Sequence, residues 1–333
     1  MSHQQKIVVL GANSFSGQDF VDLVLDDPKY DVTGVSRSPE RSAMALKYKL
    51  RRDLSRYKYV QIDLNQQIPQ LLELLDVERP EYIVNFAAQS EVAPSWEHPE
   101  DWFRTNTVAL AALLNHLRRQ TYLRRYVHVS SPEVYGTCTG TVREDAPLNP
   151  STPYAASKAA ADLLLLTYRK QFDFPLLTVR ATNVYGARQQ LFKIIPRVAI
   201  YLKLGRKIEL HGGGMAVKSY IHVRDVSRGE RDVLERGRPG EIYHLSPDEG
   251  IAVRDVVRLI CERYNRRFED TTISVDERPG QDAAYVIDST KARRELDWSP
   301  RIGLEEGVAE VVAWVEDYWE EIQQASLTYT HKP

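Results

Sequence analysis

Cysteine is scarce in this chain of 333 residues, which contains only Cys138 and Cys261. Two cysteines are too few for a disulfide framework, so we expect the chain in a reducing compartment, the cytoplasm. Cys138 is interpreted as a thiol in a polar loop without a catalytic role.

The sequence also lacks an excess of charge and a long apolar run. It has 44 Lys and Arg residues against 46 Asp and Glu residues, a formal net charge of -2. A nearly neutral chain gives no electrostatic reason to expect nucleic acid or an anionic membrane as a partner. No apolar run reaches the length of a membrane span, and the first residues, MSHQQK, lack the apolar core of a signal peptide. We therefore predict no nucleic acid, no membrane and no metal among its partners.

What is present is a regular alternation of apolar strands and helices in the first half of the chain. We predict strands at 6–10, 30–36, 59–62, 82–86, 126–130 and 176–180, and helices at 18–26, 101–120 and 153–172. This alternation is typical of an α/β protein whose parallel sheet is covered on both faces. The prediction is a Rossmann-type doubly wound parallel sheet over residues 1–182, the domain that would bind NADP.

After residue 182 the alternation loosens. We predict short strands at 207–210, 219–223, 242–245 and 272–275, and amphipathic helices at 253–264 and 304–321. These segments indicate a smaller carboxy-terminal α/β lobe for the substrate, mainly within 183–330, with some segments returning to the first domain. From residue 323 onwards we expect a loosely held tail.

A glycine-framed loop follows the first predicted strand and reads Gly11-Ala12-Asn13-Ser14-Phe15-Ser16-Gly17. A loop between a first strand and a helix is where a dinucleotide pyrophosphate binds, on backbone amides at the helix N-terminus. Ser14 stands where a middle glycine often occurs. Its Cβ would crowd the phosphate, or its hydroxyl would bind it, and the sequence leaves both readings open.

The end of the second predicted strand bears on cofactor choice. An NAD enzyme usually places a carboxylate there, which accepts hydrogen bonds from the ribose hydroxyls. This chain has Ser36 and Arg37 instead. A carboxylate would repel a 2′-phosphate, whereas Arg37 would pair with it, so we predict NADP, with NAD as the alternative. Asp63 and Leu64, after the third strand, would flank the adenine.

Tyr154 and Lys158 stand four residues apart on the predicted helix 153–172. Residues at this spacing share a helix face, so the ammonium would lie beside the phenol and lower its pKa from about 10. Such a phenol would take a proton from a sugar hydroxyl while hydride leaves the same carbon. A Tyr-x-x-x-Lys pair on a surface helix is more often merely solvated, but its place downstream of a dinucleotide loop favours an enzyme.

Several further motifs complete a family pattern. They are Asn85-Phe-Ala-Ala-Gln-Ser90, Thr105-Asn106, Ser130-Ser-Pro-Glu-Val-Tyr-Gly136, Arg180-Ala-Thr-Asn-Val-Tyr-Gly186, Arg278-Pro-Gly-Gln-Asp282 and Leu296-Asp-Trp-Ser-Pro300. With them, the chain resembles the extended short-chain dehydrogenase/reductase family from Gly11 to about Trp314. Within that family it is most similar to nucleotide-sugar 4,6-dehydratases of the dTDP-glucose and GDP-mannose kinds.

The resemblance implies roles for individual residues. Ser131 would hydrogen-bond the 4-oxygen of the substrate, Tyr154 would be the base, and Lys158 would hold the nicotinamide ribose. Asn106 would support the loop or a proton-relay water, or would merely tie a helix to a strand. Residues implied to bind the cofactor also include Ala87, Ala88 and Gln89.

Glu133 favours dehydration over simple epimerisation. Once the sugar C4 is a ketone, the C5 hydrogen becomes acidic, and a positioned carboxylate can remove it. The resemblance implies glutamate here in dehydratases and in nucleotide-sugar decarboxylases, whereas 4-epimerases do not need it. Pro132 departs from the dTDP-glucose pattern, which has Asp at this position to protonate the leaving 6-hydroxyl. Either Glu133 serves as base and acid in turn, or the chain performs a different step.

The resemblance also implies which residues hold the substrate, a nucleotide-diphosphate sugar. They are Ser90, Asn183, Lys193, Arg197, Lys218 and Arg278. Lys218 stands where the family usually has arginine, so its contact with the diphosphate would lack the bidentate fork.

The predicted function is a nucleotide-sugar 4,6-dehydratase that makes a 4-keto-6-deoxy sugar nucleotide by internal hydride transfer through bound NADP. A 4-epimerase, a 5,6-dehydratase and a decarboxylase are alternatives of the same family, and a non-catalytic NADP-binding protein is an alternative of another class.

Helices 101–120 and 153–172 carry more apolar residues than one sheet contact needs, including Leu163, Leu164, Leu165 and Leu166 in a row. The resemblance implies that these helices pair with their copies in a four-helix bundle, so we expect a homodimer.

Overall fold

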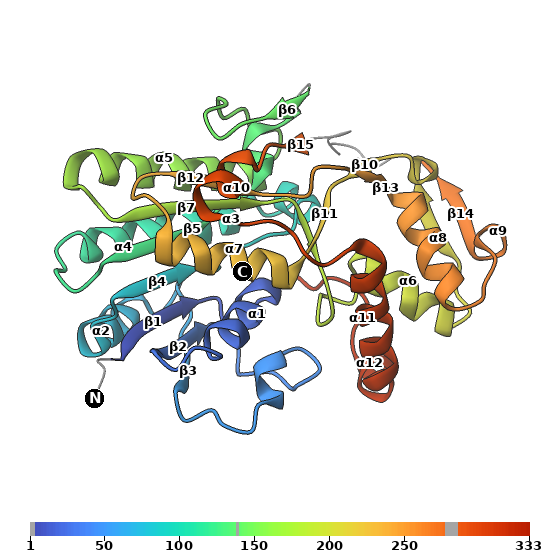
Figure 1. Ribbon diagram of the computed structural model, residues 1–333, viewed down its shortest axis with the longest axis horizontal. Coiled ribbons are helices and arrows are strands. Elements are labelled where there is room, and N and C mark those ends of the chain that lie inside the picture. Colours follow the sequence, from blue (N-terminus) through green and yellow to red (C-terminus); the bar gives the residue numbers. More distant parts are fainter. Residues whose placement is uncertain (1–3, 138–139, 277–285) are drawn as a thin grey trace.

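The centre of the protein is a seven-stranded sheet, seen in a computed structural model that describes residues 4–137, 140–276 and 286–333 (Figure 1). The strand order is β12-β7-β5-β4-β1-β2-β3, and every pairing in the sheet is parallel. Its strands are β1 Gln5–Leu10, β2 Tyr30–Ser36, β3 Tyr57–Gln61, β4 Tyr82–Asn85, β5 Arg125–Val129, β7 Leu176–Ala181 and β12 Ile242–Leu245. The predicted Rossmann-type doubly wound sheet is confirmed.

Helices cover both faces of this sheet. On one face lie α1 (Phe15–Val24) and α7 (Val223–Arg236), and on the other lie α2 (Ile68–Glu78), α4 (Ala109–Leu117) and α5 (Pro153–Phe172). Successive side chains of a strand point to opposite faces. In β1, Ile7 and Val9 therefore pack under α1 and α7, whereas Val8 and Leu10 pack under α2, α4 and α5. A strand buried on both sides reads as a continuous apolar run, which made β1 recognisable in the sequence.

Two predicted elements have a different place or shape in the structure. The predicted strand 242–245 is β12, which pairs with β7 at the edge of the main sheet and does not belong to the smaller lobe. The predicted helix 101–120 is three pieces: α3 (Pro99–Phe103), a π-helical turn at Arg104–Val108, and α4. A π turn adds a residue to the helix and often marks a functional site.

The smaller lobe lies at the right of Figure 1 around its own apolar core. Its helices are α6 (Ile194–Lys203), α8 (Val253–Arg263), α9 (Phe268–Thr271), α11 (Leu304–Asp317) and α12 (Trp319–Gln324). Its strand β9 (Ile208–His211) pairs with β14 (Thr272–Val275), and β10 (Val217–Lys218) pairs with β13 (Ile251–Ala252). The predicted helix 304–321 is broken at Tyr318, whose backbone leaves the helical region.

Short elements connect the two parts. Strand β8 (Asn183–Tyr185) pairs with β11 (Tyr220–His222), β6 (Thr141–Val142) pairs with β15 (Val286–Ile287), and α10 (Thr290–Leu296) packs against α7 and β12. Cys261 is buried in α8, and Cys138 lies outside the described residues. Among the helices of the described part of the chain, none is long and apolar enough to span a membrane.

The prediction of a loosely held tail is wrong for residues 325–333. This segment contacts Arg37, Gln89 and Asp101 of the large domain. Its polar sequence gave no sign of these contacts, because most are made by backbone carbonyl oxygens or depend on partners far away in the chain.

Candidate active site

The loop from Gly11 to Gly17 makes a tight turn between β1 and α1. Gly11 has φ +86°, and a Cβ there would lie 2.8 Å from the backbone nitrogen of Ala87. A Cβ on Gly17 would lie 2.3 Å from the carbonyl oxygen of Gly11, so α1 packs directly on the turn. Ser14 caps α1, because its Oγ accepts a hydrogen bond from the amide of Gly17. The Ser14 hydroxyl thus supports the turn, which neither reading from the sequence had included.

Asn13 holds the loops that follow β1 and β2 together. Its side-chain nitrogen donates to the carbonyl oxygens of Ser38 and Pro39 and to the Tyr59 hydroxyl, and its amide donates to Ser36 Oγ at 2.9 Å. Arg37, by contrast, points to the tail: its Nη1 donates to the carbonyl oxygens of Lys332 and Pro333 at 2.8 and 2.9 Å.

A cavity of about 650 Å³ opens at the carboxyl ends of β1, β2, β3 and β4. Its lining includes the predicted cofactor residues Gly11, Asn13, Ser14, Ser36, Arg37, Asp63, Leu64, Ala87, Ala88 and Gln89. The sheet edge reached by the carboxyl ends of the strands is where such folds bind dinucleotides, and the volume is that of a typical cofactor site.

The local structure fits a dinucleotide. The first-turn amides of α1 have no acceptor within the helix, and Ser14, Phe15 and Ser16 line the cavity space beside them. A helix N-terminus of this kind binds a pyrophosphate. Glycine at position 11 lets the loop after β4 pack directly on the turn, because any Cβ there would collide with that loop's backbone.

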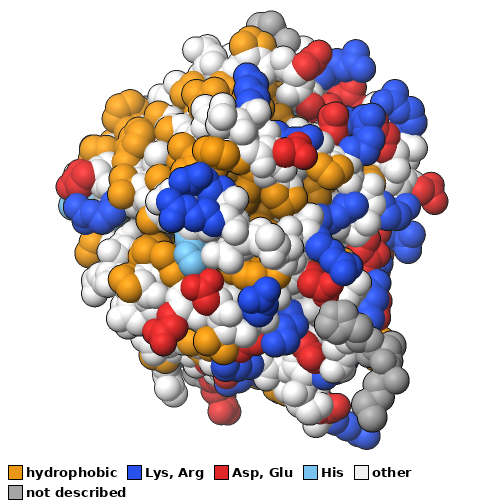
Figure 2. All heavy atoms as spheres, turned by 90° about the vertical axis from the view of Figure 1, so that its left-hand side faces the viewer, with side chains coloured by type: hydrophobic (Ala, Val, Ile, Leu, Met, Phe, Trp, Pro, Cys, Tyr) orange, Lys and Arg blue, Asp and Glu red, His pale blue; other side chains and the backbone are white. Residues whose placement is uncertain are grey.

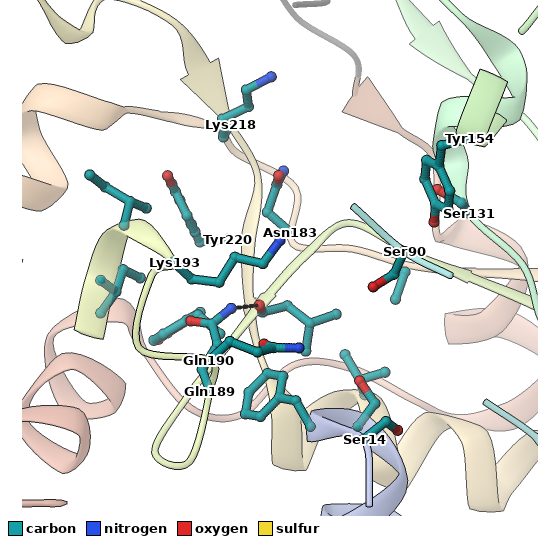
Figure 3. Close-up of a pocket in the computed structure, with 18 of the residues that line it drawn as sticks. Ser14, Ser90, Ser131, Tyr154, Asn183, Gln189, Gln190, Lys193, Lys218 and Tyr220 are labelled. Carbon is teal, nitrogen blue, oxygen red and sulfur yellow. Dashed lines mark hydrogen bonds between the residues drawn. The ribbon is translucent and has the colours of Figure 1, made fainter. Parts of the chain in front are cut away.

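The predicted catalytic residues meet at the start of α5. Ser131 ends the β5 segment and caps a 3₁₀ turn, Pro132–Tyr135, in which Glu133 follows; the amide of Glu133 donates to Ser131 Oγ at 3.2 Å. Tyr154 lies in the first turn of α5, and the Ser131 side chain lies close enough to lower the pKa of its hydroxyl. Ser131, Tyr154 and Lys158 line a second cavity of about 490 Å³, and Figure 3 shows Ser131 beside Tyr154 at one end of it.

The pKa values of Tyr154 and Lys158, the predicted catalytic pair, are shifted in directions that matter for proton transfer. Burial raises the pKa of the Tyr154 phenol above its ordinary value, the negative charge of Glu133 raises it further, and the neighbouring Ser131 side chain lowers it. Burial lowers the pKa of Lys158 to about 8, although the attraction of Asp162 opposes the change. Tyr154 therefore needs added positive charge nearby before it can act as a base.

Lys158 is held by a buried polar network that the sequence did not reveal. Its Nζ donates to the carbonyl oxygen of Val129 at 2.8 Å and lies 3.4 Å from His128 Nε2. Behind it, Asp162 accepts hydrogen bonds from Ser130 Oγ and from Arg180, each at 2.7 Å. Asp162 stands one helical turn after Lys158, so the i, i+4 spacing was the available signal.

Asn106 does not line either large cavity. From the π turn before α4, its side chain accepts from the amide of Gln89 at 2.8 Å and donates to the carbonyl oxygen of Gln89 and to Ser157 Oγ. These bonds tie the loop after β4 to α5, so Asn106 positions cofactor-lining residues and catalytic helix together.

The second cavity brings together five of the six predicted substrate residues. They are Ser90, Asn183, Lys193, Arg197 and Lys218, and Arg278 lies outside the described residues. Figure 3 shows Asn183, Lys193 and Lys218 across the cavity from Tyr154. Lys193 forms a salt bridge of 2.9 Å with Glu91, a partner that the sequence did not reveal. The two cavities are continuous, because both include Ser14, Phe86, Ala88, Ser90 and Gln190.

Comparison with known proteins gives consistent matches along the chain. Residues 8–311 match the family described as GDP-mannose 4,6 dehydratase. A dTDP-glucose 4,6-dehydratase from Streptomyces niveus is 32% identical over 328 residues, which cover 96% of each chain. A solved dTDP-glucose 4,6-dehydratase from Streptomyces venezuelae with NAD bound superposes with a TM-score of 0.87 at 29% identity, covering 95% of this chain and 98% of that one. A UDP-glucuronic acid 4-epimerase from Bacillus cereus shares the fold, with a TM-score of 0.85 at 23% identity over 94% of this chain and 99% of that one.

Proposed function

This chain belongs to the GDP-mannose 4,6 dehydratase family, and we propose that it converts a nucleotide-diphosphate hexose to its 4-keto-6-deoxy derivative. The observation that carries this proposal is the placement of Ser131, Tyr154 and Lys158 at one end of a cavity whose other end holds basic side chains. Glu133 lies near enough to Tyr154 to raise its pKa. A phenol base with a carboxylate near it suits oxidation at C4 followed by elimination across C5 and C6.

The side chains of the protein have separable tasks in this reaction. Ser131 holds the 4-oxygen of the sugar, and Tyr154 takes the proton of the 4-hydroxyl. When bound, an oxidised nicotinamide dinucleotide supplies the hydride acceptor and later returns the hydride. Lys158 is fixed by Val129 and the Asp162 network, and one helical turn after Tyr154 it supplies a positive charge on the same face of α5.

Glu133 then acts on the 4-keto sugar. It removes the C5 proton, and water leaves from C6. Pro132 has no proton to give, so Glu133 itself passes this proton to the departing hydroxyl, and a proton from solvent adds at C5 when the hydride returns to C6. The assignment of both the base and the acid role to Glu133 follows from the proline at position 132 and from the 3₁₀ turn that places Glu133 next to Ser131.

The diphosphate of the substrate belongs with the basic end of the cavity. Lys193, Arg197 and Lys218 approach it from α6 and β10. Charge-assisted contacts to phosphate from these two elements favour a diphosphate over a neutral sugar. The assignment of Arg278 to the same task remains a prediction from the sequence.

The cofactor is a nicotinamide dinucleotide, and its choice between NAD and NADP turns on Arg37. The sequence predicts NADP, and this prediction remains untested. Two observations support NAD: relatives such as the S. venezuelae enzyme were solved with NAD, and Arg37 already donates to carbonyl oxygens of the tail. We therefore assign NAD to this site. The cytoplasm stays the predicted location on the ground of the two cysteines alone.

The direct test is incubation of the protein with GDP-, UDP-, CDP- and dTDP-hexoses, followed by mass analysis of the products. We expect one nucleotide sugar to lose the mass of one water, without net consumption of added dinucleotide. The control is the Lys158→Met protein, which should give no product because the charge beside Tyr154 is gone. Absence of water loss with every sugar nucleotide would contradict the proposed reaction.

A second copy of the chain is the proposed partner. Apolar side chains remain exposed on α3, the π turn and α5, among them Val108 at 63% and Leu163 at 54% exposure. The others are Phe103, Leu166 and Phe172. Figure 2 faces the side of the molecule on which α2, α4 and α5 lie in Figure 1, and hydrophobic side chains gather over it. A self-complementary patch of this kind suits a two-fold dimer.

Light scattering at micromolar concentration should therefore give the mass of two chains, twice 38.2 kDa. Leu163→Asp should shift the protein to one chain, because a charge cannot stay buried in an apolar interface. The matched control is Ile273→Asp, an exposed apolar side chain on β14 in the smaller lobe, which should leave the mass unchanged. A single-chain mass for the unaltered protein would contradict the dimer.

A further inference from the structure

The last residues of the chain return from the smaller lobe to the mouth of the dinucleotide cavity. Helix α12 ends at Gln324, yet in Figure 1 the C-terminal end lies in the middle of the view and not beside α12. The carbonyl oxygen of Lys332 accepts hydrogen bonds from Arg37 Nη1 at 2.8 Å and from Gln89 Nε2 at 2.6 Å. Arg37 follows β2 and Gln89 follows β4, so one backbone carbonyl joins two loops on either side of β1.

His331 anchors this segment in the large domain. Its Nε2 lies 2.8 Å from Asp101 Oδ2, and its ring stacks on the rings of His98 and Trp102 at centroid distances of 4.6 and 5.3 Å. The ligand atoms of His98, Asp101 and His331 lie within 4.8 Å of one another. The planes of the two imidazoles are only 8° apart, however, and stacked parallel rings cannot both direct a nitrogen at one ion. The cluster therefore fits an aromatic anchor better than a metal site.

Tyr329 contacts the side of the dinucleotide cavity that is nearest the predicted substrate residues. Its ring meets Phe192 edge-on at a centroid distance of 5.7 Å. Phe192 precedes Lys193, which bridges to Glu91 near the loop after β4. The segment therefore contacts the large domain through His331 and the residue before Lys193 through Tyr329.

Because of these contacts the segment lies along the edge of the dinucleotide cavity and does not fill it. Tyr329, Thr330 and Lys332 line the cavity of about 650 Å³ together with Gly11, Asn13 and Ser36. The remaining space still has the size of a typical cofactor site. A peptide that competed for the site would occupy the space beside Gly11 instead of bordering it.

We propose that residues 327–333 form a strap that belongs to the dinucleotide site: it closes over bound NAD, slows its release and keeps Arg37 from binding a 2′-phosphate. The inference rests on the proposed function only in requiring that this cavity holds a nicotinamide dinucleotide. A cofactor that is regenerated within each turnover has no need to leave, so a strap that retains it suits internal hydride transfer.

The experiment compares the full chain with a chain that ends at Ser326. Each is loaded with NADH, and its release into excess NAD is followed by the loss of protein-bound nicotinamide fluorescence. We expect release from the shortened chain to be about ten- to a hundredfold faster, since a hydrogen bond to a charged group and the stacked anchor are lost together. His331→Ala, which removes the anchor and keeps the backbone, should speed release by about three- to tenfold.

The matched control is His116→Ala, which removes a histidine that pairs with an aspartate, Asp76, at the same distance of 2.8 Å on helices away from the cavity. Its release rate should equal that of the unaltered chain. Circular dichroism and thermal unfolding establish that each variant is folded. Unchanged or slower release from the shortened chain would overturn the strap, and tighter NAD binding would identify the segment as a competitor of the cofactor.

Calorimetric titration of both chains with NAD and with NADP tests the role of Arg37. The shortened chain should bind NADP about tenfold more tightly relative to NAD than the full chain does, because the guanidinium becomes free to pair with the 2′-phosphate. An unchanged ratio would refute the effect of the strap on cofactor choice. A full chain that binds neither dinucleotide would instead refute the cofactor assignment itself, so the two failures are distinct.

Discussion

Replacement of Tyr154 by phenylalanine is expected to lower kcat by a factor of about 100 to 10,000, the usual loss when a general base is removed. The ring would still fill its buried place at the start of α5, and only the hydroxyl beside Ser131 would be lost. NAD affinity should therefore change little. The measurement is the rate of 4-keto product formation with the sugar nucleotide found by mass analysis, together with calorimetry of NAD binding.

Tyr168→Phe is the matched control for this change. Tyr168 lies on the same helix, and its ring packs against Phe172 and Phe174 far along the helix from the cavity. Its loss of a hydroxyl should leave kcat near that of the unaltered protein. If Tyr154→Phe kept more than about a tenth of the original rate, Tyr154 would not be the base.

Glu133→Gln is expected to separate oxidation from elimination. Glutamine keeps the shape of the side chain and loses its basicity, so hydride transfer from C4 should still occur while removal of the C5 proton slows by about 100- to 10,000-fold. Absorbance of reduced nicotinamide should then build up during the reaction, with little 4-keto-6-deoxy product. Because Pro132 cannot act as an acid, a smaller build-up is expected in the unaltered protein too.

A reaction in deuterium oxide checks the same step independently. If Glu133 removes the C5 proton, the product of the unaltered enzyme must carry deuterium at C5. Glu78→Gln serves as control, since that carboxylate only pairs with Lys6 and Lys58 at the surface. Inversion at C4 without loss of water and without deuterium at C5 would make the enzyme a 4-epimerase and would overturn the proposed reaction.

The Rossmann-type sheet could be predicted because its central strands are recognisable from the local sequence alone. Strands β1, β4 and β5 are buried on both faces and read as short apolar runs, while α5 has its predicted bounds, Pro153–Phe172. Strand β12 was predicted at the correct residues, and some segments after residue 182 were expected to return to the first domain, but the sequence did not show that this strand is one of them. Its position beside β7 depends on a pairing between residues far apart in sequence, which no local pattern records.

The side chains proposed to react could likewise be predicted from the sequence, but the residues that hold them in position could not. Tyr154 and Lys158 follow from i, i+4 spacing on one helix, whereas Ser131 and Glu133 follow only from the resemblance to the dehydratase family. The partners of Lys158 come from β5, α5 and β7, which meet only in the folded sheet. Burial in this network, and not any neighbour in sequence, lowers the pKa of Lys158 to about 8.

The sequence by itself thus determined the fold class and the place of the dinucleotide loop, because both are encoded in local spacing and apolar periodicity, and its family motifs predicted the residues of the reaction. The tertiary structure alone decided what surrounds them: Ser14 used as a helix cap, Asn106 as a tie between loop and helix, and Arg37 bound by the carbonyl oxygens of a tail almost 300 residues away. Those contacts are made by backbone groups that every residue possesses, or by side chains brought together from distant segments. Their positions are set by the packing of the whole chain, so they cannot be predicted from any single segment of the sequence.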